Sequence, residues 1–398
     1  MINTNFLNES ISDIEQKGLK RSLKNVSGPQ GARILVDDRE VLNFCSNNYL
    51  GLADDERLKR AAVEAIEKEG VGSGASRLVC GNMSSHRKLE ETLAEFKGAE
   101  ACLFFSTGYM ANVGIISSLF GAGDLILSDK FNHASIIDGI LLSKAQYRRY
   151  SHLDMEALEG QLEKISRDDP SGCLYKKKVI VTDSVFSMDG DIAPLDKIVE
   201  LAQKYQAMVM VDEAHALGVL GQGGKGAVEH FGLEGKIDIQ MGTLSKAAGV
   251  FGAYVCGAKV LIEFLINRAR SFIYTTSLPP MVCAAAMRGI EIIRDEPERR
   301  EQLWENVRYF KNGLNVLGFN TMNSQTPIIP VLIKDSSLAM EFSKRLLASG
   351  VFVQAIRPPT VAQNTARLRV TVMATHQKTD MDFVLEKFEL IGKELCLI

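Results

Sequence analysis

The sequence lacks the features that mark several common classes of protein. It has no internal repeat and no apolar run of the roughly 18 residues that a membrane helix needs. Its first 24 residues are polar and amphipathic, without the apolar core of a signal peptide. Lys and Arg number 46 against 49 Asp and Glu, so no excess of positive charge favours nucleic acid or an anionic surface. We therefore expect a soluble, cytoplasmic protein that binds neither nucleic acid nor membrane.

Cysteine is present, but not in a pattern that builds a disulfide framework or a zinc site. The seven cysteines form no C-x-x-C pair and have no regular spacing; they are Cys45, Cys80, Cys102, Cys173, Cys256, Cys283 and Cys396. An odd and dispersed set fits a reducing compartment. The sequence also has no H-E-x-x-H, no H-x-H and no carboxylate-rich loop, so we expect no metal site.

Short apolar runs alternate with longer helical periods over much of the chain. The runs are continuous rather than alternating, which is typical of parallel strands that helices cover on both faces. We expect strands at 101–106, 124–129, 178–185, 207–214, 237–243 and 252–257, and helices at 84–98, 135–143 and 194–206. The pattern predicts an α/β fold with a three-layer domain, in which helices cover both faces of a mostly parallel central sheet.

The pattern changes near residue 280, where a long helical stretch is followed by short strands and helices. This composition is typical of a smaller α+β domain. Near the other end, ARILVDDREVLNF predicts a hairpin that turns at Asp37–Asp38. We therefore expect an N-terminal arm and hairpin at 1–45, a large domain at 46–285 that holds the ligand, and a small C-terminal domain at 286–398.

The most unusual residue is Lys246, which stands among small and apolar residues in MGTLSKAAGVFGAYV, residues 241–255. Burial disfavours the ammonium form of a lysine and lowers its pKa, so a nucleophilic amine becomes available near neutral pH. Such lysines form Schiff bases with carbonyl compounds, including pyridoxal 5'-phosphate. The setting of Lys246 therefore predicts a catalytic lysine.

Polar residues at other predicted strand ends suit the same cofactor. Asp212 follows an apolar strand and would keep the pyridine nitrogen protonated, and His215 lies three residues further on. The stretch STGYMAN at 106–112 and Thr243 offer hydroxyls and a helix start to a phosphate, while His133 is available to stack on the ring. A structural Asp212 that caps a helix and a His215 that only fills the core are the alternatives.

A competing motif is GQGGKG at 221–226, which matches the G-x-G-x-x-G pattern of dinucleotide sites. It does not open a helix directly after the first strand of the chain, and no acidic residue stands about 20 positions further on at a strand end. A nicotinamide-dependent oxidoreductase is thus the alternative from a different class, with weaker support.

Several long segments resemble the α-oxoamine synthases, a branch of the fold-type I pyridoxal-phosphate enzymes. The similar segments, in family order, include NFCSNNYLGL, GVGSGASRLVCGNMSSHRKLE, FNHASIIDG, DSVFSMDGDIAPL, VDEAHALGVLGQGGKG, GTLSKAAGVFGAYV, YTTSLPP and AIRPPTVAQNTARLRVT. They span nearly the whole chain. The resemblance implies fold type I, decarboxylative condensation of an amino acid with an acyl thioester, and a homodimer whose sites are shared between subunits.

The same resemblance implies a role for each matching residue. Catalysis would depend on Lys246, His133, Asp212 and His215, with Lys246 carrying the Schiff base and acting as the acid–base. Cofactor contacts would come from Lys246, Gly108, Tyr109, His133, Ser187, Asp212, His215, Thr243 and Thr275, the last reaching the phosphate of the neighbouring subunit. Substrate contacts would come from Arg21, Asn47, Ser76, His133, Thr360 and Arg369, with the fork of Arg369 on the amino-acid carboxylate.

Within the family, IRPPTV and TARLR are most similar to the branch that joins L-alanine to a pimeloyl thioester, on CoA or on a carrier protein, in biotin biosynthesis. Glycine with an acetyl donor and a longer-chain acyl donor, as in serine palmitoyltransferases, are the alternatives. A non-catalytic relative is a further class, and the joint presence of Lys246, Asp212 and His133 argues against it.

Overall fold

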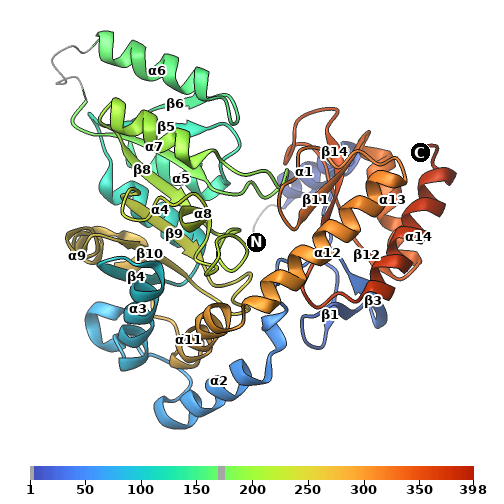
Figure 1. Cartoon of the computed structure of the whole chain (residues 1–398), viewed down its shortest axis with the longest axis horizontal. Helices are drawn as coiled ribbons and strands as arrows, with labels where there is room; N and C mark the ends of the chain where they lie inside the picture. Colours follow the sequence, from blue (N-terminus) through green and yellow to red (C-terminus); the bar gives the residue numbers. More distant parts are fainter. Residues whose placement is uncertain (1–3, 169–174) are drawn as a thin grey trace.

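A seven-stranded sheet lies at the centre of the larger part of the molecule (Figure 1). The computed structural model describes residues 4–168 and 175–398, so Cys173 lies outside the described residues. In the order β4-β10-β9-β8-β7-β5-β6, the strands are β4 (Ala101–Phe105), β10 (Ala253–Gly257), β9 (Ile239–Thr243), β8 (Met208–Asp212), β7 (Lys178–Asp183), β5 (Leu125–Asp129) and β6 (Gln146–Tyr150). Strand β10 is antiparallel to the other six strands, which are parallel to one another. This confirms the predicted, mostly parallel sheet.

Helices cover both faces of this sheet, as the continuous apolar runs predict. One apolar core contains residues of α3 (Ser84–Lys97), α6 (Met155–Asp168), α7 (Leu195–Lys204) and α11 (Pro280–Asp295), and the other contains residues of α4 (Gly108–Leu119), α5 (Ala134–Ser143), α9 (Lys259–Arg268) and α10 (Arg270–Ile273). Successive strand residues point to opposite faces, so Phe104 belongs to the first core and Phe105 to the second. Apolar residues are therefore needed at every position of such a strand.

The C-terminal part forms a second, smaller α+β unit beside the large sheet (Figure 1). Its sheet has the order β11-β14-β13, with β11 (Ile328–Lys334), β14 (Ala366–Thr371) and β13 (Gln354–Ile356). The helices α12 (Pro297–Val316), α13 (Ser336–Ala348) and α14 (Lys378–Glu394) belong to the same unit. In Figure 1, α12 extends from the large part toward this unit.

The N-terminal hairpin joins the C-terminal part and not the large sheet. Asp37 and Asp38 link β2 (Arg33–Val36) to β3 (Arg39–Asn43), and their φ angles of 47° and 64° form the two-residue turn that the sequence predicts. Strand β3 pairs in parallel with β12 (Val351–Phe352). The remaining elements are α1 (Asn5–Gln16), β1 (Val26–Ser27), α2 (Glu56–Glu69), α8 (Ala227–His230) and the short helices Leu52–Asp54 and Arg77–Gly81.

The division at residues 45 and 285 stays a prediction, and the second boundary falls inside α11.

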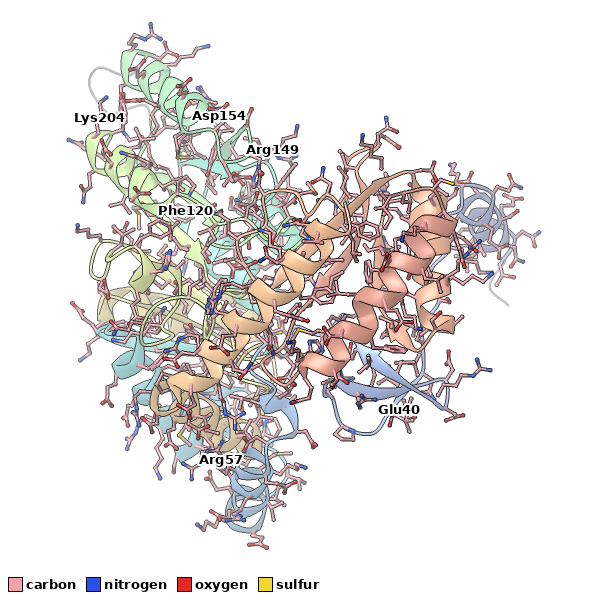
Figure 2. All side chains as sticks on the ribbon, turned by 45° about the vertical axis from the view of Figure 1, so that its right-hand side comes forward. Glu40, Arg57, Phe120, Arg149, Asp154 and Lys204 are labelled. Atoms are coloured by element: carbon pink, nitrogen blue, oxygen red, sulfur yellow. The ribbon has the colours of Figure 1, made fainter. Side chains whose placement is uncertain are left out.

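A charged cluster holds α2 to the junction that follows α11. Arg57, labelled in Figure 2 near the start of α2, pairs with Asp55 at 2.9 Å and also with Glu296, which lies between α11 and α12. The two parts of the molecule are thus linked by side chains as well as by α12.

A buried ion pair fastens the end of β8 to α3. The Nζ of Lys97 donates to the carboxylate of Glu213, and these side chains are 1% and 0% exposed. Lys97 also donates to the carbonyl of Lys225, and the N–H of Val228 donates to Glu213 at 2.9 Å. Because Glu213 directly follows the last residue of β8, the pair fixes the chain at that end of the sheet.

Replacing Lys97 with Met should destabilise the fold strongly, since it leaves the Glu213 carboxylate buried without a cation. We expect the free energy of unfolding to fall by about 3–5 kcal/mol in urea denaturation. The double variant Lys97→Met/Glu213→Leu removes both charges and should regain most of that loss. A single variant as stable as the parent would contradict this interpretation.

Candidate active site

The carboxyl ends of neighbouring parallel strands meet at one pocket. Strand β7 ends at Asp183 and β8 at Asp212, directly opposite each other in the ladder, and β9 ends at Thr243. The pocket has a volume of about 110 Å³ and is lined by Gly108, Tyr109, Asn112, His133, Ser135, Asp183, Ser187, Asp212, Ala214, His215, Met241, Thr243, Ser245 and Lys246. All four predicted catalytic residues therefore lie in one pocket, at the sheet edge where α/β folds bind ligands.

Lys246 lies in the pocket wall, where it is half-buried. This loss of hydration lowers the pKa of its amine to about 8, against the opposing charges of Asp212 and Asp183, and the positive charge of Arg369 lowers it further. An amine with this pKa is partly neutral near pH 7, so it is available both as a nucleophile and as a base.

Asp212 shares the pocket with Lys246 and is a buried group whose two carboxyl oxygens both accept a hydrogen bond. Its Oδ2 accepts from the side-chain amide of Asn112 at 2.8 Å, and its Oδ1 accepts from the N–H of Ala214 at 2.8 Å. The second carboxyl, Asp183, has a pKa raised well above its ordinary value by burial and by the neighbouring charge of Asp212. The pocket thus holds one hydrogen-bonded carboxylate and one carboxyl group that favours its neutral form.

A short network fixes the ring of His133. Its Nδ1 is 2.7 Å from the hydroxyl of Ser135, which accepts from Asn112 at 2.9 Å. The backbone N–H of His133 donates to Asp183 at 2.6 Å. Burial lowers the pKa of His133, so the imidazole is neutral near pH 7, as suits a ring that stacks on a flat ligand. Asn112 lies in a stretch that the sequence singles out, but the sequence assigns it no role.

His215 is held by a residue that the sequence analysis missed. The hydroxyl of Tyr49 is 2.6 Å from Nδ1 of His215. Burial, together with the charges of Lys246 and Arg369, lowers the pKa of His215 well below its ordinary value, and burial raises the pKa of Tyr49 to about 12. When the Tyr49 hydroxyl donates to Nδ1, the ring proton is on Nε2, where His215 acts as a hydrogen-bond donor.

The start of α4 and the loop after β9 offer groups that suit a phosphate. Thr107 caps α4 by accepting from the N–H of Met110 at 3.1 Å, and the first residue of the helix, Gly108, lines the pocket. The hydroxyls of Thr243 and Ser245 are 2.7 Å apart on the same pocket wall. Helix starts and hydroxyls are common phosphate ligands. Ser245 is a further candidate phosphate ligand. The sequence indicates it only by its position, since its hydroxyl directly precedes Lys246.

Arg369 reaches this site from the C-terminal part. It is 8% exposed, and its Nε donates to the carbonyl of Ser187 at 2.6 Å while one Nη donates to the side chain of Asn47 at 3.0 Å. The other Nη donates to Thr371 at 3.0 Å. The structure therefore brings together the two predicted carboxylate contacts, Asn47 and Arg369, next to the pocket residue Ser187.

The remaining predicted residues lie outside the pocket. Arg21 and Thr360 are exposed, on two segments that Arg357 joins by donating to the carbonyl of Gly18 at 2.9 Å. Ser76 and Thr275 do not line this pocket, and Thr275 lines a separate small hollow. The roles of these four residues stay predictions.

The glycine-rich loop at 221–226 binds a side chain of its own chain. The N–H groups of Gly223 and Lys225 both donate to the carboxylate of Glu229 at 2.9 Å. A Cβ on Gly221 would lie 2.1 Å from a Glu229 oxygen. The Glu229 carboxylate therefore fills the space beside these glycines and binds the N–H groups that a dinucleotide phosphate would need. This removes the basis of the dinucleotide alternative.

The described residues contain neither a cluster of metal ligands nor a helix suited to span a membrane. Over residues 4–168 and 175–398, no group of three His, Cys, Asp or Glu side chains is arranged to hold a metal ion. Within the same ranges, no helix has both the length and the hydropathy of a membrane span.

Comparisons with known proteins agree with this geometry. Residues 39–388 match the family described as aminotransferase class I and II. The chain is 52% identical over 395 residues, 99% of each chain, to the 8-amino-7-oxononanoate synthase of Symbiobacterium thermophilum. A serine palmitoyltransferase from S. paucimobilis, solved with a bound pyridoxal phosphate–myriocin aldimine, has a TM-score of 0.92 at 33% identity over 99% of this chain and 98% of that chain.

A solved 8-amino-7-oxononanoate synthase from Francisella tularensis has a TM-score of 0.76 at 33% identity, over 90% of this chain and 98% of that chain. These matches confirm the resemblance that the sequence motifs carry, and they extend over nearly the whole length of the proteins compared. The chain belongs to the aminotransferase class I and II family and, within it, to the group of the 8-amino-7-oxononanoate synthases.

Proposed function

We propose that this protein condenses L-alanine with a pimeloyl thioester, with loss of CO₂ and of the thiol, to give 8-amino-7-oxononanoate in biotin biosynthesis. The observation that carries the proposal is Lys246 in one pocket with Asp212, His133 and His215, in a chain so similar to a synthase of that name. The cytoplasm, where thioester donors are made, is the compartment that we propose.

The donors in the pocket fit pyridoxal phosphate. Lys246 supplies the amine that a Schiff base needs, and Asp212 supplies a buried anion for the pyridine nitrogen. Thr243, Ser245 and the start of α4 supply ligands for a phosphate. When bound, the cofactor supplies the electron sink for the negative charge that forms at the amino-acid Cα.

The chain's own residues bind the amino acid and move its proton. Arg369 offers a fork-shaped guanidinium for the substrate carboxylate, preorganised by the carbonyl of Ser187 and the amide of Asn47. Lys246 takes the proton from Cα and later returns it, because a base with a pKa of about 8 can do both near neutral pH. His215, with its proton on Nε2, would hold the hydroxyl of the cofactor ring, and His133 would stack on that ring.

We also propose a homodimer in which Thr275 reaches the neighbouring pocket. In its own subunit Thr275 lines a separate hollow with Arg77 and Ser277, outside the main pocket. In this dimer, Thr275 of a second copy of the chain would complete the phosphate site.

The substrate choice is tested by steady-state assays of L-alanine, glycine and L-serine, each against acetyl-, pimeloyl- and palmitoyl-CoA. We expect the highest kcat/KM for L-alanine with pimeloyl-CoA, by about tenfold or more over the other pairs. A pimeloyl-carrier protein, assayed in parallel, separates the two donors. Highest kcat/KM for glycine with acetyl-CoA or for L-serine with palmitoyl-CoA would contradict the proposal.

The amine of Lys246 should set the pH dependence of cofactor capture. Below its pKa the lysine is an ammonium ion without a free electron pair, so the rate of covalent capture of pyridoxal phosphate should rise with pH and level off above about 8. Stopped-flow absorbance on cofactor-free protein measures this rate. Lys246→Ala should form no visible absorption band, and a midpoint near 10.5, the value of an ordinary lysine, would refute the effect of burial.

Arg369→Lys should raise the KM for the amino acid by about 10- to 100-fold, because an ammonium group cannot replace a fork that makes three directed hydrogen bonds. Far-UV circular dichroism checks that the variant folds. The matched control is Arg345→Lys, since the ion pairs that Arg345 forms with Glu341 and Glu394 are exposed to solvent, and its kinetics should equal those of the parent. Equal KM values for Arg369→Lys and the parent would exclude this role.

A further inference from the structure

His152 forms a bridge between two carboxylates that belong to different segments. It lies in the turn between β6 and α6; Figure 2 labels two residues that flank this turn, Arg149 and Asp154, near each other at the end of the large sheet. The Nδ1 of His152 is 2.9 Å from Asp129, and its Nε2 is 3.0 Å from Asp191. His152 does not line the pocket, and the sequence motifs give it no role.

The bridge requires a charged imidazolium. Both ring nitrogens face a carboxylate, and both can donate only when the ring carries two protons. Burial lowers the pKa of His152, but the hydrogen bonds and charges of Asp129 and Asp191 outweigh it and raise the pKa to about 9. The ring stacks on Phe131 with centroids 4.4 Å apart and meets Phe186 edge-on at 4.4 Å, so its position is fixed from both sides.

The first carboxylate of the bridge organises the segment that carries His133. Asp129 ends β5, and its side chain also accepts from the N–H of Phe131 at 2.8 Å. The residue after Phe131, Asn132, donates to the carbonyl of Val181 at 2.7 Å. His133 then follows directly, so the segment 129–133 is short and closely hydrogen-bonded.

The second carboxylate belongs to Asp191, the residue whose backbone closes the turn that carries Ser187. The N–H of Phe186 donates to the backbone carbonyl of Asp191 at 3.1 Å. The N–H of Gly190 donates to the backbone carbonyl of Phe186 at 2.8 Å. On its other side this turn is held by strand β14, through Arg369 on the Ser187 carbonyl and Arg367 on Asp189 at 2.6 Å. The turn 186–191 thus contacts the C-terminal sheet on one side and His152 on the other.

We propose that His152 is a positioning residue, whose imidazolium holds the His133 segment and the Ser187 turn at a fixed spacing across the pocket. This inference rests on the proposed function, because it assigns those two segments to the cofactor site. Without the cation, the carboxylates of Asp129 and Asp191 lose their shared partner and repel each other, so the two segments move apart. An aromatic ligand held between them then loses both affinity and alignment.

The test compares His152→Gln with the parent holoenzyme and with His230→Gln. His230 lies on α8, where its ring meets only Phe231 among the ring contacts of the described residues, and its replacement should change nothing. For His152→Gln we expect the dissociation constant of pyridoxal phosphate, measured by absorbance titration, to rise about tenfold. We also expect kcat to fall by about 10- to 100-fold. The KM for the acyl thioester should change by less than about threefold, because its proposed contacts, Arg21 and Thr360, lie on other segments.

A double-mutant cycle separates positioning from mere stabilisation. Asp191→Asn alone should match His152→Gln, and adding it to His152→Gln should change the dissociation constant little further, because both changes break the same bridge. Asp191→Asn also serves if His152→Gln does not fold. A lower melting temperature with parental kcat and cofactor affinity in both single variants would overturn the proposal. Parent enzyme that binds the cofactor but acts on none of the thioesters overturns the proposed function instead, and the affinity comparison still decides the role of His152.

Discussion

The site depends on opposite charges that are held together out of water at the edge of the central sheet. Asp212 ends β8 opposite Asp183 of β7, whose carboxyl favours the neutral form, and the charges of Asp212 and of Arg369 both act on the amine of Lys246. Each charge is costly to bury alone, and each becomes tolerable because the others are present. The same arrangement leaves the lysine with a reduced pKa, so the balance that lets the pocket exist also makes its amine reactive.

Hydrogen bonds within and beside the pocket hold its polar side chains in place. Asn112 and the N–H of Ala214 occupy Asp212, and Tyr49 occupies one nitrogen of His215. Burial lowers the pKa of both histidines and so favours their neutral forms, which leaves Lys246 and Arg369 as the sources of positive charge among these groups. A pocket organised in this way favours a ligand with an anionic phosphate and a basic ring nitrogen.

The sequence predicts the buried strands within one or two residues, because a strand covered on both faces must be apolar at every position. It misses β6, whose residues QYRRY lie at the exposed edge of the sheet and carry no apolar run. The reversed direction of β10 leaves no trace in its composition, because β10 is buried between its neighbours just as the parallel strands are. The pairing of β3 with β12 joins residues about 300 positions apart, and no local pattern reports it.

The site was predictable where a polar residue interrupts an apolar run, as at Lys246 and Asp212. Asp183 gives the same signal at the end of its strand and was missed, whereas Tyr49 gives none, because its partner lies far away in the sequence. The motifs that contain Ser76 and Thr275 do not reveal that both residues lie outside the lining of the pocket.

The pairing of β3 with β12 also bears on how the chain is made. The hairpin at 33–43 leaves the ribosome early, but the strand that completes its sheet is synthesised some 300 residues later. At 5–20 residues per second, that is a delay of roughly 15–60 s. During this interval one edge of the hairpin has no partner strand, so the newborn chain exposes it to chaperones and to other chains until the C-terminal part emerges.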